Sequence, residues 1–187
     1  MEAFLVSTGI VALAEMGDKT QLLSLVLAAR FRKPWPIVAG ILVATLANHA
    51  LAGALGTWVT TLLGPDVLRW VLGVSFLAMA AWMLIPDKVD SDEVDKTRQM
   101  GVFATTVVAF FLAEMGDKTQ IATVALAARY HDLVGVVAGT TLGMMLANAP
   151  VVWFGERITR MLPIRVVHMV SAGVFCVLGI LALLGWG

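Results

Sequence analysis

The sequence is short of charged residues and of cysteine. Only 14% of its 187 residues are charged, whereas about a quarter of the residues in a soluble domain carry a charge. Cys176 is the one cysteine, so an intramolecular disulfide and a cysteine-based metal cluster are both excluded. The formal net charge is zero, which gives no indication of a nucleic acid partner. These shortages exclude an ordinary soluble globular domain.

Apolar residues are abundant instead, and they gather in long blocks. They make up 59% of the sequence and fall in six blocks of about 20 residues, the length that crosses a bilayer as a helix. We therefore predict an all-α integral membrane protein with six transmembrane helices. The first block carries charged residues in its middle and follows no basic segment, so we expect a retained helix rather than a cleaved signal peptide. The predicted helices span 3–29, 36–62, 67–85, 101–128, 133–154 and 164–186.

One stretch of nine residues occurs twice. Leu13–Gln21 (LAEMGDKTQ) is repeated without a change as Leu112–Gln120, 99 positions later. Shorter matches follow at the same offset, and the pair Ala47-Asn48 matches Ala147-Asn148 with one residue inserted. The sequence therefore predicts two three-helix repeats, 1–86 and 100–187, joined by an acidic linker at 87–99.

The odd number of helices in each repeat predicts an inverted topology. The second repeat must enter the membrane from the side opposite to the first, an arrangement that recurs among secondary transporters. Nine arginines and lysines lie in the three loops on one side, whereas the other side has only Arg69 and Arg129. By the positive-inside rule the first side is cytoplasmic. Both termini are then expected outside the cell, and the linker in the cytoplasm.

Each copy of the repeated stretch brings two acids and a lysine into an apolar block, at a cost of about 2.5–3.5 kcal/mol per charge. On a continuous helix Glu15 and Asp18 would share a face, with Lys19 one turn from Glu15. If the two copies meet, four carboxylates and two ammoniums leave a formal charge of −2, which one divalent cation balances. Carboxylate oxygens suit hard cations such as calcium, magnesium or manganese. The predicted metal ligands are Glu15, Asp18, Glu114 and Asp117.

Neighbouring residues supply further groups to such a site. Glycine between the two acids can loosen the helix and free backbone carbonyls, which is tolerated where the backbone lines a cavity. Crowded carboxylates also bind protons, because like charges favour the neutral form. A site that holds either a cation or protons is the minimum that an exchanger needs. The expected supporting residues are Gly17, Gly116, Lys19, Lys118, Thr20, Thr119, Gln21, Gln120, Asn48 and Asn148.

Some of these residues have a purely structural alternative. The Glu–Lys pairs could be salt bridges that hold two helices together. The lysines could also neutralise a carboxylate in the empty site, or lock two helices and move aside when metal enters. Asn48 and Asn148 could join helices through hydrogen bonds instead of binding metal.

The doubled E-x-G-D-K-T motif, in helices 1 and 4 of a six-helix inverted repeat, resembles a family of cation/proton exchangers that includes the human Golgi manganese transporter and bacterial manganese exporters. The resemblance covers the whole chain. It implies exchange of manganese or calcium for protons, with the motif acids as the cation site. The short chain is similar to prokaryotic members, which implies the bacterial inner membrane.

Three functions are weighed on this basis. The leading hypothesis is a secondary antiporter that exports manganese or calcium from the cytoplasm, with no cofactor and with metal, protons and the lipid bilayer as partners. The alternatives are an exporter of a small organic cation or amino acid, and an intramembrane aspartyl protease. The protease needs only two aspartates, whereas each copy here adds a glutamate and a lysine. The choice between manganese and calcium and the oligomeric state stay open.

The charge bias makes the topology testable. Short tags placed at either terminus should react with a membrane-impermeant label on intact cells, because both termini are expected outside. A tag inserted in the 87–99 linker should react only after the membrane is permeabilised. Labelling of the N-terminal tag only in permeabilised cells would contradict the inverted arrangement.

Overall fold

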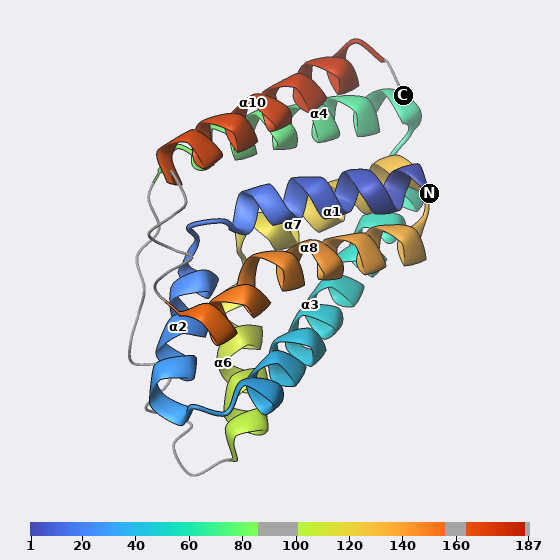
Figure 1. Cartoon of the computed structure of the whole chain (residues 1–187). Coiled ribbons are helices and arrows are strands. Elements are labelled where there is room, and N and C mark those ends of the chain that lie inside the picture. Colours follow the sequence, from blue (N-terminus) through green and yellow to red (C-terminus); the bar gives the residue numbers. More distant parts are fainter. Residues whose placement is uncertain (86–100, 156–163, 186–187) are drawn as a thin grey trace.

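The computed structural model describes residues 1–85, 101–155 and 164–185. The predicted acidic linker, 87–99, lies outside these residues. The described residues form eight helices and no strand (Figure 1). The helices are α1 (Glu2–Glu15), α2 (Lys19–Phe31), α3 (Pro34–Leu62), α4 (Pro65–Trp82), α6 (Val102–Glu114), α7 (Lys118–Tyr130), α8 (Leu133–Phe154) and α10 (Ile164–Leu183).

The predicted helices 3–29 and 101–128 are each broken in two, so the expectation of a continuous helix at the motif is wrong. The break falls between α1 and α2 in the first repeat, and between α6 and α7 in the second. At the breaks Gly17 has φ +85° and Gly116 has φ +74°. This left-handed region is open to glycine at little cost and ends a right-handed helix. The other four predicted helices are present, with ends within about four residues of those expected.

Three of the described helices are long and apolar enough to cross a membrane. They are Pro34–Leu62, Leu133–Phe154 and Arg165–Leu183. The half-helix α6 is also apolar but shorter. These segments give the chain the character of an integral membrane protein, whereas the full set of six spans stays a prediction.

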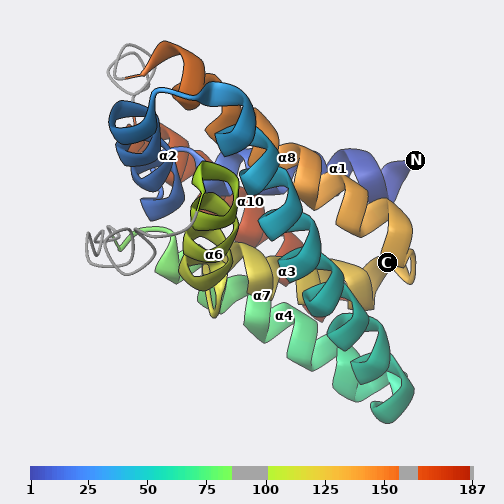
Figure 2. The same ribbon diagram turned by 90° about the horizontal axis from the view of Figure 1, so that it is seen from below.

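In each repeat the first half of the broken helix (α1 or α6) packs on the long helix (α8 or α3) of the other repeat. In the first repeat α1 lies along α8, and in the second α6 lies along α3. The second half-helices follow the same rule, since α2 contacts α8 and α7 contacts α3 (Figure 2). The long helices α3 and α8 contact each other directly. Exchanging the two repeats therefore leaves this packing pattern unchanged.

The last helices of the two repeats form a separate pair. α4 and α10 lie side by side and run in opposite directions along one side of the bundle (Figure 1). The rings of Phe76 and Phe175 stack between them, with 6.2 Å between centroids. Both phenylalanines belong to a buried apolar cluster that also includes Ala14 of α1 and Leu126 of α7. This cluster attaches the pair to the two broken helices.

Equivalent glycines let α1 approach α8 and α6 approach α3. A Cβ atom at Gly40 of α3 would lie 2.7 Å from the Cβ of Thr106 in α6. A Cβ atom at Gly139 of α8 would overlap the carbonyl oxygen of Phe4 and lie 3.0 Å from the Cβ of Ser7 in α1. Small residues at such crossings are typical of helix packing in membranes, where backbones must come close.

Replacing one of these glycines should destabilise the bundle. We expect Gly139→Ala to lower the free energy of unfolding by about 1–3 kcal/mol, because the added methyl group meets a backbone atom that cannot move aside. Gly9→Ala in α1 is the matched control, because nothing lies within 4 Å of a Cβ there. Thermal unfolding in detergent micelles measures both variants. Equal melting temperatures would contradict the close packing of α1 on α8.

Candidate cation site

The four predicted acids lie at the two helix breaks. Glu15 is the last residue of α1 and Glu114 the last of α6, while Asp18 and Asp117 immediately precede α2 and α7. The backbone N–H of each aspartate donates to the carbonyl of the glutamate in its own copy, at 3.0 and 3.1 Å. All four side chains are buried. Two tight turns thus place four acids inside the bundle.

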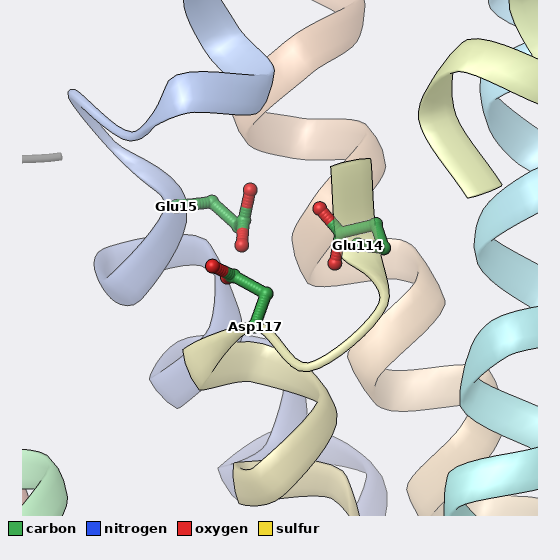
Figure 3. Close-up of side chains that lie close together, drawn as sticks. All are labelled: Glu15, Glu114 and Asp117. Atoms are coloured by element: carbon green, nitrogen blue, oxygen red, sulfur yellow. The ribbon is translucent and has the colours of Figure 1, made fainter. Parts of the chain in front are cut away.

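Three of the acids converge on one point (Figure 3). Glu15, Glu114 and Asp117 each offer a carboxylate oxygen, and these oxygens all lie within 4.8 Å of one another. Within the part of the chain that the structure describes, Glu15 Oε1, Glu114 Oε1 and Asp117 Oδ2 are buried and accept no hydrogen bond. Buried acceptors without a donor are costly. A cation placed among them would satisfy all three.

The fourth acid takes part in a different contact. Asp18 Oδ1 lies 3.4 Å from Lys118 Nζ, and Asp117 Oδ1 lies 3.0 Å from Lys19 Nζ. The lysine of each copy therefore pairs with the aspartate of the other copy. A continuous helix would instead favour pairing of each lysine with the glutamate one turn away in its own copy. The two crossed ion pairs join the breaks to each other.

The two lysines differ in their surroundings. The side chain of Lys118 is 1% exposed, whereas that of Lys19 is 26% exposed. The Lys118–Asp18 pair is thus enclosed in the bundle, and the Lys19–Asp117 pair is partly accessible. Identical motifs occupy unequal environments in this structure.

The threonines of the motif support the glutamates. Thr20 Oγ1 donates to Glu15 Oε2 at 2.5 Å, and Thr119 Oγ1 donates to Glu114 Oε2 at 2.9 Å. Each hydroxyl thereby satisfies one oxygen of a glutamate, while the other oxygen accepts no hydrogen bond from the described residues. In this structure the threonines therefore hold the side chains of the two glutamates.

The glutamines stabilise the turns themselves. Gln21 Oε1 accepts from the backbone N–H of Gly17 at 3.0 Å, and Gln120 Oε1 accepts from that of Gly116 at 2.7 Å. These N–H groups would otherwise lack a partner, because the helix is interrupted there. Each glutamine therefore compensates for the break that its own motif creates.

The glutamine amide groups also reach the long helices. Gln120 Nε2 donates to Asn48 Oδ1 at 3.0 Å, and Asn48 Nδ2 donates to the carbonyl of Phe111 at 3.0 Å. Gln21 Nε2 donates to the carbonyl of Ala147 at 3.1 Å. Asn48 thus joins α3 to both parts of the second broken helix, as expected of a residue that holds helices together by hydrogen bonds.

Asn148 joins α8 to the first broken helix through a different partner. Its Oδ1 accepts from Ser24 Oγ of α2 at 2.9 Å, and its Nδ2 donates to the Met144 carbonyl at 3.2 Å. Both asparagines therefore hold a long helix against the second half of a broken helix.

Sequence reasoning missed Ser24. The one signal available was a hydroxyl residue one turn beyond Thr20, inside an otherwise apolar run. At the equivalent position of the second repeat, Thr123 donates to the Thr119 carbonyl of its own helix instead, at 2.7 Å. The repeat therefore did not indicate that this position contacts a long helix.

The arrangement can hold a hard divalent cation. Four carboxylates and two lysines carry a formal charge of −2, and all of these side chains except that of Lys19 are buried. A buried net charge is unfavourable without a counter-ion. Oxygen-only ligands match manganese, calcium or magnesium and match softer metals poorly. No cysteine or histidine belongs to the described group of converging ligands.

Comparison with known proteins agrees with this chemistry. A family model described as the divalent cation/proton antiporter GDT1 matches residues 3–91 and 102–186. A proposed manganese exporter of Vibrio cholerae is 55% identical over 96% of this chain and 90% of its own length. GDT1-like protein 4 of rice is 28% identical over 99% of this chain and 71% of its own length. A GDT1-like protein of Synechocystis is 25% identical over 94% of this chain and 93% of its own length. No solved structure matches the chain significantly.

Proposed function

Because the chain belongs to the GDT1 family of divalent cation/proton antiporters, we propose that it exports manganese from the cytoplasm in exchange for protons, with calcium as a second substrate. Membership makes the chain a transporter and not an enzyme, so the protease alternative is set aside. The single observation that carries the proposal is the group of three carboxylate oxygens within 4.8 Å of one another at the two helix breaks. Oxygen ligands at that spacing surround one hard cation.

The proposed ligands are Glu15, Glu114 and Asp117, joined by Asp18 during the transport cycle. The first three have buried oxygens that accept no hydrogen bond from the described residues. Asp18 is held by Lys118 in this structure, at 3.4 Å. An arriving cation would compete with both lysines for the aspartates, so metal entry and loosening of the crossed ion pairs are coupled.

Protons are the proposed counter-substrate at the same carboxylates. Once the cation has left, the site is again at −2, which is unfavourable to bury. Like charges only a few ångströms apart favour protonation of one or more of the acids. Protons would therefore take the place of the cation on the return half of the cycle.

The choice of manganese over calcium rests on the Vibrio cholerae relative, whose name assigns it manganese export. The ligand chemistry accepts both ions. The proposed location is the bacterial inner membrane, with both termini outside and metal moving outward. The nine-to-two loop bias favours this orientation.

The inverted repeat, 1–86 against 100–187, is part of the same proposal. Three observations support it. The helix contacts keep the same pattern when the two repeats are exchanged, and each repeat has a break at the equivalent glycine, between α1 and α2 and between α6 and α7. The start of α1 and the end of α10 also lie at the same end of the bundle (Figure 1). Transporters with inverted repeats commonly bind ions where broken helices meet, because helix C-terminal ends and freed carbonyls attract cations. Glu15 and Glu114 end α1 and α6 in this way.

Amide variants test the ligands. We expect Glu15→Gln, Glu114→Gln and Asp117→Asn each to reduce manganese uptake into inverted vesicles roughly tenfold or more, the range seen when a metal site loses a supporting group. The amides keep side-chain shape but remove a charged ligand. Glu2→Gln is the control, because Glu2 lies at the exposed start of the same helix α1. Wild-type rates in all three variants, with normal insertion, would show that the carboxylates are structural.

Competition between metal and protons is the second test. Manganese affinity should fall as pH is lowered through the titration of the site carboxylates, and binding should release protons, because both effects express one equilibrium. Calorimetry in two buffers of different ionisation enthalpy counts the released protons. Lys118→Met makes the site more negative, so we expect tighter binding and slower turnover. Zero released protons across the working pH range would contradict exchange and favour a uniporter.

A further inference from the structure

A partly polar cavity lies away from the cation site. It has a volume of about 350 Å³ and lies between the first turns of α4 and the last turns of α7 and α10. The start of α1 lies at this end of the bundle as well (Figure 1). None of the proposed metal ligands lines the cavity. The lining residues are Pro65, Asp66, Leu68, Arg69, Leu72, Ala128, Arg129, His131, Ala182 and Gly185.

The charged groups of this cavity are unusual for this side of the protein. Arg69 and Arg129 are the only two loop or helix-end bases that the sequence places here, against nine on the opposite side. Both arginines line this cavity, together with His131 and one acid, Asp66. Two guanidinium groups on facing helices therefore give the cavity a positive balance. That balance repels a divalent cation, so the cavity does not suit the transported metal.

Arg69 has a hydrogen-bond donor without an acceptor. Its Nε is buried, and no described residue accepts a hydrogen bond from it. The side chain lies against the end of α10, where its Nη1 is 3.4 Å from the position that a Cβ of Gly185 would take. A buried guanidinium N–H without a partner is costly, and an anionic oxygen is the acceptor that it prefers.

The other residues that line the cavity are apolar. Leu68 and Leu72 of α4 and Ala182 of α10 line the cavity along with the arginines. Next to Arg69, the side chain of Trp70 is 56% exposed, as expected of an aromatic residue at the level of lipid headgroups. A ligand that fits must therefore join an anionic group to a hydrocarbon part.

We propose that this cavity binds an anionic membrane phospholipid, whose phosphate group contacts Arg69 and Arg129 and whose hydrocarbon part contacts Leu68 and Leu72. Basic pockets between membrane helices hold lipid headgroups in this manner. A planar guanidinium presents two N–H groups to phosphate oxygens at once. The proposal concerns a site separate from the cation site and does not rest on the antiport function.

Lipid binding to the purified full chain tests the proposal. The delipidated protein in neutral detergent is titrated with dioctanoyl phosphatidylglycerol, dioctanoyl phosphatidylcholine and inorganic phosphate, and bound molecules are counted by native mass spectrometry. We expect one phosphatidylglycerol to bind more tightly than phosphatidylcholine, and inorganic phosphate to bind weakly. Arg69→Gln and Arg129→Gln should each weaken phosphatidylglycerol binding roughly tenfold, the loss expected for a charge-assisted hydrogen bond.

Two further variants keep the test decisive. Arg165→Gln removes an exposed arginine from the first turn of α10, outside the cavity, and should bind phosphatidylglycerol as the wild type does. Arg69→Lys keeps the positive charge but loses the planar guanidinium group that contacts two phosphate oxygens at once, so it should bind phosphatidylglycerol with intermediate affinity. It should also fold even if Arg69→Gln does not. Equal phosphatidylglycerol binding by the wild type, Arg69→Lys and Arg129→Gln would overturn the proposal. Inorganic phosphate bound as tightly as phosphatidylglycerol would also overturn it, by assigning the cavity to free anions.

Discussion

Burial of four carboxylates and Lys118 inside a mostly apolar bundle, with Lys19 at its edge, is the constraint to which the rest of this structure responds. Each charge placed in a membrane segment costs about 2.5–3.5 kcal/mol by insertion scales. The crossed pairs Lys19–Asp117 and Lys118–Asp18 offset part of this cost, at 3.0 and 3.4 Å. Among the described residues they leave Glu15 and Glu114 without an ion-pair partner, because two lysines cannot neutralise four acids. The remaining formal charge of −2 is the charge that one divalent cation, or protons, would balance in the proposed function.

The helix breaks are the means by which the chain brings these acids together. A continuous helix would place Glu15 and Asp18 along one face and satisfy its own backbone. The turn at Gly17 instead directs two acids inward and frees backbone groups inside the bundle, where they need partners. The motif glutamines provide those partners at the glycine N–H groups, while the motif threonines hold the glutamates. Each residue of the nine-residue motif that is not apolar therefore has a role in making or supporting the break.

The two halves hold each other in place and yet are not equivalent. The first half-helix of each repeat packs on the long helix of the other, and Asn48 and Asn148 join the long helices to the broken ones. Lys118 is enclosed whereas Lys19 is partly accessible. The same nine residues thus experience two environments in this structure.

The sequence by itself determined the class of fold, the duplication and the four acids, since apolar blocks, a repeat of nine identical residues and charges within apolar blocks are all local properties of the chain. It also indicated that glycine between the acids could loosen the helix, but not that the helix ends there. Only the tertiary structure decided which lysine pairs with which aspartate, because Lys118 and Asp18 lie 100 positions apart. It likewise decided that Ser24 contacts Asn148 and that two arginines share a cavity. Helical periodicity relates residues within a few turns, whereas these contacts depend on how the helices of two repeats cross.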